Sequence, residues 1–241
     1  MIETQDSRLK RGIYLLPNLF TTAALFSGYY AIVAAMKGQF DMAAVAIFIA
    51  MLMDSLDGRV ARLTNTQSAF GAQYDSISDV VAFGLAPALV VYNWSLYSLG
   101  KVGWLIAFVY TAATALRLAR FNVQLEGGDK RYFIGLPCPS AAGILAGLVW
   151  LGGEFSLHGV NMAYFVLVLT FLVAAAMVSN ILYPSFKEVD LKGKVSFMAV
   201  LMVVLIFVAI AVNPPTMLFT VFFGYGLYGA LHSLWRRYFK A

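Results

Sequence analysis

The sequence predicts an all-α fold, a polytopic bundle of about eight transmembrane helices with both chain ends in the cytoplasm. Hydrophobic residues make up 61% of the 241 positions and charged residues only 12%. This composition excludes a soluble globular domain. Uncharged runs such as Leu15 to Met36 and Val160 to Tyr183 contain the ~20 residues that a helix needs to cross the hydrocarbon core, whereas transmembrane strands would show alternation.

The distribution of basic residues along the chain indicates how the protein is oriented across the membrane. With the amino terminus in the cytoplasm, only Lys37 and Lys101 of the 17 basic residues fall outside. Basic residues concentrate in cytoplasmic loops, so this bias favours two cytoplasmic ends and an even number of spans. Membrane topology also explains the net charge of +5 better than nucleic-acid binding does, because the basic residues are scattered between apolar spans.

Glycine and proline breaks separate the expected spans. The first span follows three basic residues, but it is too long for a secretion signal and lacks a clear cleavage site. The second and third form a hairpin over residues 41–92, the fourth ends in two arginines, and the fifth is short and contains Pro139. The sixth and seventh are uncharged, and the eighth leads into a basic tail. The spans lie near residues 15–36, 41–63, 71–92, 102–121, 137–152, 160–183, 195–212 and 216–235. No separate soluble domain fits, so residues 1–241 are expected to form a single domain.

Four aspartates stand inside this apolar chain. Asp54 and Asp57 are three residues apart and Asp75 and Asp79 are four apart, so each pair shares one helix face. The short loop between the two helices brings both pairs toward a common point at the cytoplasmic edge. A carboxylate at membrane depth costs roughly 2.5–3.5 kcal/mol on insertion scales. Four together therefore indicate a functional site.

The donor chemistry of this cluster predicts a divalent metal site. About four negative charges repel one another unless cations enter, and two divalent ions would balance them. Carboxylate-only ligation favours Mg²⁺, Mn²⁺ or Ca²⁺ over zinc. A cation transporter is an alternative reading, but its site is expected near the midplane of the membrane.

Small residues follow the first aspartate pair. Gly58 costs about 1 kcal/mol relative to alanine inside a helix, which a close ligand approach to the backbone would explain, and Ala61 leaves space one turn later. Arg62 could then reach a phosphate. Close helix packing is the alternative reading of Gly58.

The eight positions Asp54, Asp57, Gly58, Ala61, Arg62, Gly71, Asp75 and Asp79 resemble the complete motif of the CDP-alcohol phosphotransferase family. The resemblance implies a six-helix core, here with two helices added. Four further stretches are similar to the phosphatidylserine synthase branch of this family: residues 15–21, 75–88, 116–122 and 133–137. This similarity covers the first 140 residues and implies transfer of a phosphatidyl group from CDP-diacylglycerol to L-serine, with release of CMP. Other members use acceptors such as glycerol phosphate or inositol phosphate. The identification of serine as the acceptor therefore depends only on the similarity to the phosphatidylserine synthase branch.

The resemblance also implies roles for individual residues. Asp54, Asp57 and Asp75 are expected to hold two ions, Mg²⁺ or Mn²⁺, and Asp79 to contact metal and act as the general base. Gly58, Ala61 and Arg62 are expected to contact the CMP portion. By the same analogy we expect a homodimer, and the compact single-domain form favours a bacterial inner membrane over an endomembrane.

Three other side chains are candidates for the substrate site. Asn18 either lines the nucleotide pocket or caps the first span after Pro17. Arg117 and Arg120, three residues apart, form a cationic face for the donor phosphate or the serine carboxylate, or serve only to orient the span. Cys138 is expected to be a small packing residue.

Overall fold

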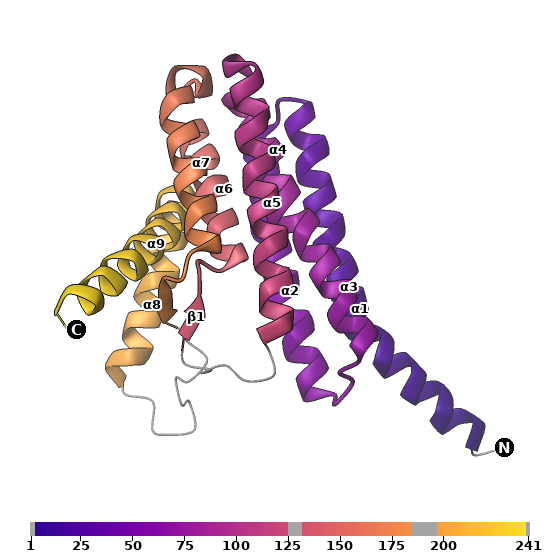
Figure 1. Ribbon diagram of the computed structural model, residues 1–241. Helices are drawn as coiled ribbons and strands as arrows, with labels where there is room; N and C mark the ends of the chain where they lie inside the picture. The colour runs from indigo at the N-terminus through magenta and orange to yellow at the C-terminus, as the bar shows by residue number, and fades with distance from the viewer. Residues whose placement is uncertain (1–2, 125–131, 185–196, 240–241) are drawn as a thin grey trace.

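The computed structural model describes residues 3–124, 132–184 and 197–239, which form a helical bundle (Figure 1). Helices α1 to α5 make up its amino-terminal half: α1 (Glu3–Met36), α2 (Phe40–Leu63), α3 (Ala69–Asp79), η1 (Val80–Leu85), α4 (Ala86–Trp94), η2 (Leu96–Leu99) and α5 (Lys101–Gln124). The other half contains β1 (Tyr132–Ile134), α6 (Cys138–Glu154), η3 (Gly159–Met162), α7 (Ala163–Val178), β2 (Leu182–Pro184), α8 (Phe197–Val212) and α9 (Pro214–Phe239).

Each expected span corresponds to helical structure at nearly the same residues. The third comprises α3, η1 and α4 in succession, and the sixth comprises η3 and α7. Four segments are long and apolar enough to cross a membrane: Leu16–Met36, Ala69–Trp94, Lys101–Val123 and Gly159–Val178. Eight crossings and the cytoplasmic position of both chain ends stay predictions.

The prediction of a helical fold is confirmed, and one boundary was wrong. Helix α1 begins at Glu3 and extends beyond the bundle (Figure 1), while its apolar span covers Leu16–Met36, close to the expected 15–36. The helix of the sixth span ends at Val178, and residues 182–184 form a strand instead. This strand pairs antiparallel with β1, with Phe133 opposite Tyr183. A small two-stranded element therefore joins the segment before α6 to the segment after α7.

Gly135 lies between β1 and α6, and its backbone conformation is not helical. Its φ is +78°, and an added Cβ would meet the carbonyl oxygen of Met177. Its N–H donates to Ile181 O at 2.8 Å, and the next N–H, that of Leu136, donates to Ala176 O at 3.0 Å. A glycine is required because only glycine adopts this backbone without a steric cost. The turn joins the start of α6 to the end of α7.

Small side chains allow the first two helices to pack closely. Helices α1 and α2 run antiparallel around a turn at Gly38, whose φ is +73°. Their contact buries alanines from both helices, namely Ala31, Ala34, Ala35, Ala43, Ala44 and Ala46. Such small residues let helix backbones approach within a membrane. This hairpin places the far end of α2 beside α1 and α3.

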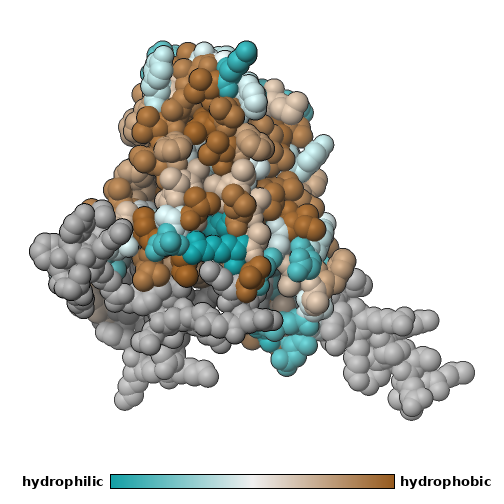
Figure 2. Space-filling model, viewed as in Figure 1, coloured by the Kyte–Doolittle hydropathy of each residue, from teal (hydrophilic) through white to brown (hydrophobic). Residues whose placement is uncertain are grey.

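An apolar surface covers most of the bundle. Figure 2 shows a hydrophobic belt with hydrophilic residues at its upper rim and across its lower part. Lys37 and Lys101 lie at one end, at the α1–α2 and η2–α5 connections. The connection from α2 to α3 lies at the opposite end, at the bottom of Figure 1. The aspartates belong to this second end.

Candidate active site

The connection between α2 and α3 is short and internally bonded. Thr66 N–H donates to Ala61 O at 3.0 Å, and Asn65 adopts a left-handed φ of 52° that turns the chain. Ser68 then caps α3, because its hydroxyl accepts the N–H of Gly71 at 3.0 Å. The two helices therefore leave and enter the connection side by side, with both aspartate pairs near it.

All four aspartates come together as the sequence predicts. One carboxylate oxygen from each of Asp54, Asp57 and Asp75 lies within 4.8 Å of the others. Asp79 lies close enough to Asp54 to interact with it, and Asp57 likewise interacts with Asp75. Each contact joins α2 to α3. Repulsion between the carboxylates is thus concentrated in one small volume.

The residues present fit a divalent cation. The donors are all carboxylate oxygens, the type that Mg²⁺ and Mn²⁺ prefer. Asp75 Oδ1 is buried and finds no hydrogen-bond partner among the described residues. A buried acceptor without a donor is costly, so a cation is the expected partner. The assignment of each aspartate as a metal ligand stays a prediction.

Thr21 of α1 is a site residue that the sequence reasoning missed. Its hydroxyl donates to Asp57 Oδ2 at 2.7 Å, and the side chain is only 3% exposed. The backbone oxygen of Thr21 accepts from the hydroxyl of buried Ser78 at 3.1 Å. An isolated threonine in an apolar span belongs to no sequence pattern that would predict a functional site. Its place in the stretch 15–21, which resembles the phosphatidylserine synthases, was the available signal.

The structure favours one of the two interpretations of Gly58. Among the described residues, no heavy atom outside its own helix backbone lies within 4 Å of the place where a Cβ would stand. Close helix packing therefore does not explain this glycine, and the space beside it is open. Ala61 is partly exposed and Arg62 is exposed on the same helix.

Asn18 lies inside α1, so its alternative as a cap of the first span is wrong. Its side-chain oxygen would be 3.4 Å from a Cβ on Gly71. It therefore reaches the start of α3, next to the α2–α3 connection. Its role at the nucleotide stays a prediction.

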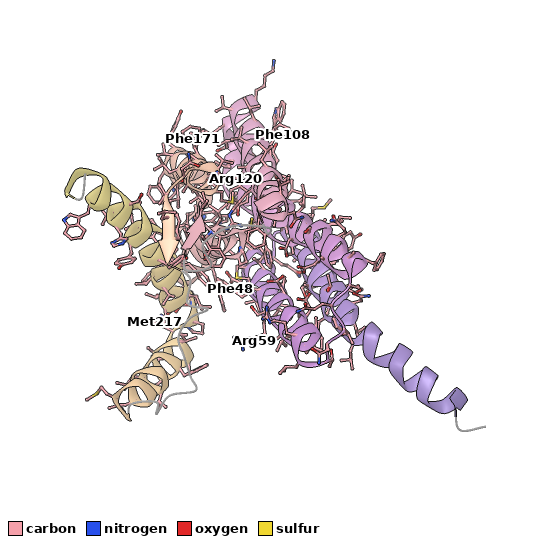
Figure 3. The ribbon with its side chains drawn as sticks, turned by 60° about the horizontal axis from the view of Figure 1, so that its bottom comes forward. Phe48, Arg59, Phe108, Arg120, Phe171 and Met217 are labelled. Atoms are coloured by element: carbon pink, nitrogen blue, oxygen red, sulfur yellow. The ribbon has the colours of Figure 1, made fainter. Side chains whose placement is uncertain are left out.

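Arg117 and Arg120 differ in their surroundings. Arg117 is 8% exposed, and its Nη1 donates to Cys138 Sγ at 3.4 Å. Arg120 lies nearer the surface, where Nη2 donates to Asn180 Oδ1 at 2.7 Å. Figure 3 brings the aspartate end of the bundle forward and labels Arg120 of α5 and Arg59 of α2 there. The expected packing role of Cys138 is confirmed by its complete burial.

A π-helical stretch follows Asp79 directly. Residues Val80–Leu85 form η1, and the hydroxyl of Tyr110 donates to Phe83 O at 3.0 Å. Gly28 of α1 is tightly seated there, because a Cβ on it would lie 2.7 Å from Ala82 Cα. Such stretches change the direction of a helix and are frequent at functional sites. The sequence does not show this feature.

One protein family and several known proteins are similar to this chain over the residues that form the site. The model of the CDP-alcohol phosphatidyltransferase family matches residues 14–182. A Helicobacter pylori protein named CDP-diacylglycerol–serine O-phosphatidyltransferase is 39% identical over 223 residues, 92% of each chain. A Methanocaldococcus jannaschii protein of the same name is 40% identical over 140 residues, 58% of this chain and 62% of that one. An archaetidylserine synthase of Methanothermobacter thermautotrophicus is 36% identical over 171 residues, 70% of this chain and 69% of that one. The family match covers α2 and α3 with all four aspartates, and the chain belongs to the CDP-alcohol phosphatidyltransferase family.

Proposed function

We propose that this chain transfers the phosphatidyl group of CDP-diacylglycerol to the hydroxyl of L-serine, forming phosphatidylserine and CMP. The observation that carries the proposal is the meeting of four aspartates from α2 and α3 beside the open space at Gly58. Similarity over 92% of the chain to a relative named CDP-diacylglycerol–serine O-phosphatidyltransferase supports serine as the acceptor.

The aspartates are proposed to hold the divalent ions of the reaction. Asp54, Asp57, Asp75 and Asp79 would bind two ions, Mg²⁺ or Mn²⁺, with Ca²⁺ as an alternative. Such ions, when bound, neutralise pyrophosphate charge and stabilise the departing phosphate. Thr21 orients Asp57 through its 2.7 Å hydrogen bond.

Asp79 is proposed as the general base. It accepts the proton of the serine hydroxyl while the serine oxygen bonds to the phosphatidyl phosphorus. The bond from this phosphorus to the bridging oxygen breaks, and CMP leaves with that oxygen. Positioning and electrostatics supply most of the stabilisation in phosphoryl transfer. The contact of Asp79 with Asp54 keeps the proton acceptor beside the metal ligands.

The nucleotide is proposed to occupy the space beside Gly58. Ala61 adds room on the same helix, while Arg62 and Asn18 supply polar contacts from two sides. Arg117 and Arg120 are proposed to bind anionic groups of the donor or the acceptor. The aspartates lie in the halves of α2 and of the span Ala69–Trp94 that are nearer to the α2–α3 connection, which suits a lipid donor with a polar head.

The positive charge bias supports a cytoplasmic active site, proposed to lie in a bacterial inner membrane. A homodimer is proposed by family analogy.

A test of the function follows the release of CMP. Purified protein in detergent with CDP-diacylglycerol and Mn²⁺ or Mg²⁺ should release CMP when L-serine is added, and phosphatidylserine should appear in equal amount. Glycerol phosphate and inositol phosphate serve as competing acceptors. Turnover with one of these and none with serine would exclude the proposed acceptor.

A further inference from the structure

A pocket of about 540 Å³ lies at the end of the bundle opposite to the four aspartates. Its walls come from the α1–α2 turn at Gly38, the end of α4 at Trp94, η2 at Tyr97 and the connection from α6 to α7. This end is at the top of Figure 1. The volume is in the range of sites that bind small ligands, and the proposed reaction does not use this pocket.

Glycines and a buried hydrogen bond fix the shape of the pocket. A Cβ on Gly152 would meet the ring of Trp94, and one on Gly159 would meet the Trp94 backbone oxygen. The hydroxyl of Ser95, which is completely buried, donates to Gly159 O at 2.7 Å. The end of α4 is therefore held against the α6–α7 connection, and Trp94 is held in the wall of the pocket.

Asp41 gives the pocket its charge. It is the only carboxylate among the lining residues, and no lysine or arginine lines the pocket. Its exposed carboxylate forms no hydrogen bond or ion pair with a described residue. It lies over Gly153, where a Cβ would meet Asp41 Oδ1. One carboxylate is too few for a divalent metal site, which uses several oxygen ligands, but it attracts a monovalent cation.

Aromatic residues line the same space as this carboxylate, namely Phe40, Trp94 and Tyr97. Aromatic rings attract organic ammonium groups, and tryptophan and tyrosine do so more strongly than phenylalanine. Tyr97 is 53% exposed, so its ring is within reach of a ligand. The combination of one carboxylate and several rings complements an ammonium group better than a metal ion or an anion.

The rim of the pocket indicates that this ammonium group belongs to a lipid. Leu157 and Val160 line the pocket and are each 44% exposed, so an apolar surface continues outward from it. Trp104, near the start of α5 at the same end, is also exposed, as is typical of aromatic residues at the depth of the lipid head groups. A lipid can rest its acyl chains on this surface while its head group enters the pocket.

We propose that this pocket binds the ammonium head group of a zwitterionic phospholipid, phosphatidylethanolamine being the probe. The Asp41 carboxylate pairs with the ammonium group, and the rings of Trp94 and Tyr97 flank it. Phosphatidylserine carries a carboxylate beside its ammonium group, which Asp41 repels, so the pocket favours phosphatidylethanolamine over phosphatidylserine. The inference does not depend on the proposed function.

The experiment measures lipid binding to the full chain by native mass spectrometry. Purified protein in detergent, without divalent ions, is titrated with phosphatidylethanolamine, phosphatidylserine or phosphatidylglycerol of identical acyl chains. Phosphatidylethanolamine should bind about 3- to 10-fold more tightly than either of the others, as one charged hydrogen bond at an exposed site predicts. O-phosphoethanolamine has the head group without acyl chains, and it should not displace the lipid at equal concentration because it buries no apolar surface.

Asp41→Asn should weaken the binding of phosphatidylethanolamine by the same factor. Glu154→Gln is the matched control, because Glu154 is an exposed carboxylate at the same end that does not line the pocket. Tyr97→Leu keeps an apolar side chain and removes the ring, and it should weaken binding about 2- to 5-fold, as for an exposed cation–π contact. Tyr164→Leu is its control, because Tyr164 is exposed and lies outside the lining.

Equal affinities for phosphatidylethanolamine and phosphatidylglycerol would overturn the proposal. So would unchanged binding in Asp41→Asn, or an equal loss in Glu154→Gln. Displacement by O-phosphoethanolamine at equal concentration would assign the pocket to a soluble amine and overturn the lipid assignment. If Asp41→Asn does not fold, the two tyrosine variants decide: a loss confined to Tyr97→Leu supports the proposal, and equal binding in both refutes it. None of these outcomes involves turnover, so each is distinct from a failure of the proposed function.

Discussion

Replacing Thr21 by valine tests how the aspartate cluster is held. Valine keeps the shape of threonine and removes the hydroxyl, which donates to Asp57 Oδ2 at 2.7 Å. The side chain is 3% exposed, so water cannot readily replace it as a donor. Asp57 would then lose a partner that fixes its carboxylate against α1. The expected result is weaker metal binding in a protein that still folds.

The magnitude follows from the type of bond. A hydrogen bond to a charged group contributes about 1.5–3 kcal/mol, and loss of a residue that orients a metal ligand typically costs 10- to 100-fold in metal affinity. The two ranges agree, since 1.4 kcal/mol corresponds to about one factor of ten. We therefore expect the half-saturating Mn²⁺ concentration of Thr21→Val to rise about 10- to 100-fold, with kcat at saturating metal reduced far less.

The assay titrates Mn²⁺ in two ways, by CMP release and by the metal-dependent rise in thermal unfolding temperature. Thr22→Val is the control, because this neighbouring hydroxyl donates to Asn18 O at 2.7 Å and pairs with Tyr74 rather than with an aspartate. An unchanged Mn²⁺ requirement in Thr21→Val would refute the reasoning. So would an equal shift in both variants, because the effect would then not depend on Asp57.

Three further substitutions give distinct results. Asp79→Asn should lower kcat at least about 100-fold, as for loss of a general base, in a folded protein; near wild-type CMP release would remove Asp79 from that role. Gly58→Leu should raise KM for CDP-diacylglycerol while thermal stability holds or improves, because the space beside Gly58 is open and leucine is the better helix former by roughly 1 kcal/mol; a drop in stability with unchanged KM would favour a packing role. Gly135→Ala should destabilise the fold by at least about 1–2 kcal/mol, the cost of a left-handed backbone, because φ is +78° there; an unaltered unfolding temperature would contradict this.

Local sequence rules were enough to place the helices and the aspartates. The uncharged runs and their glycine or proline breaks located the helical segments, because both signals act within one or two turns. The spacing of Asp54, Asp57, Asp75 and Asp79, with a short loop between the pairs, was enough to bring them to one point. These predictions use the geometry of two helices that are adjacent in sequence.

Contacts between segments that are distant in the sequence could not be predicted from such local rules. The pairing of β1 with β2 joins residues some fifty positions apart, and neither strand is long enough to show an alternating pattern. Thr21 meets Asp57 across 36 positions, and an isolated threonine in a span has no visible partner in the sequence.

The same reasoning explains why the two arginines could not be told apart beforehand. Arg117 and Arg120 share a helix face and a charge, so their local sequence is equivalent. Their difference arises from other elements: Cys138 at the start of α6 bonds to Arg117, and Asn180, after α7, bonds to Arg120. An arginine already bonded to an amide oxygen has less free capacity for a ligand than one whose Nε is buried without a partner. The surroundings of the two arginines therefore depend on the packing of α6 and α7 against α5, whereas the aspartate cluster belongs to one hairpin.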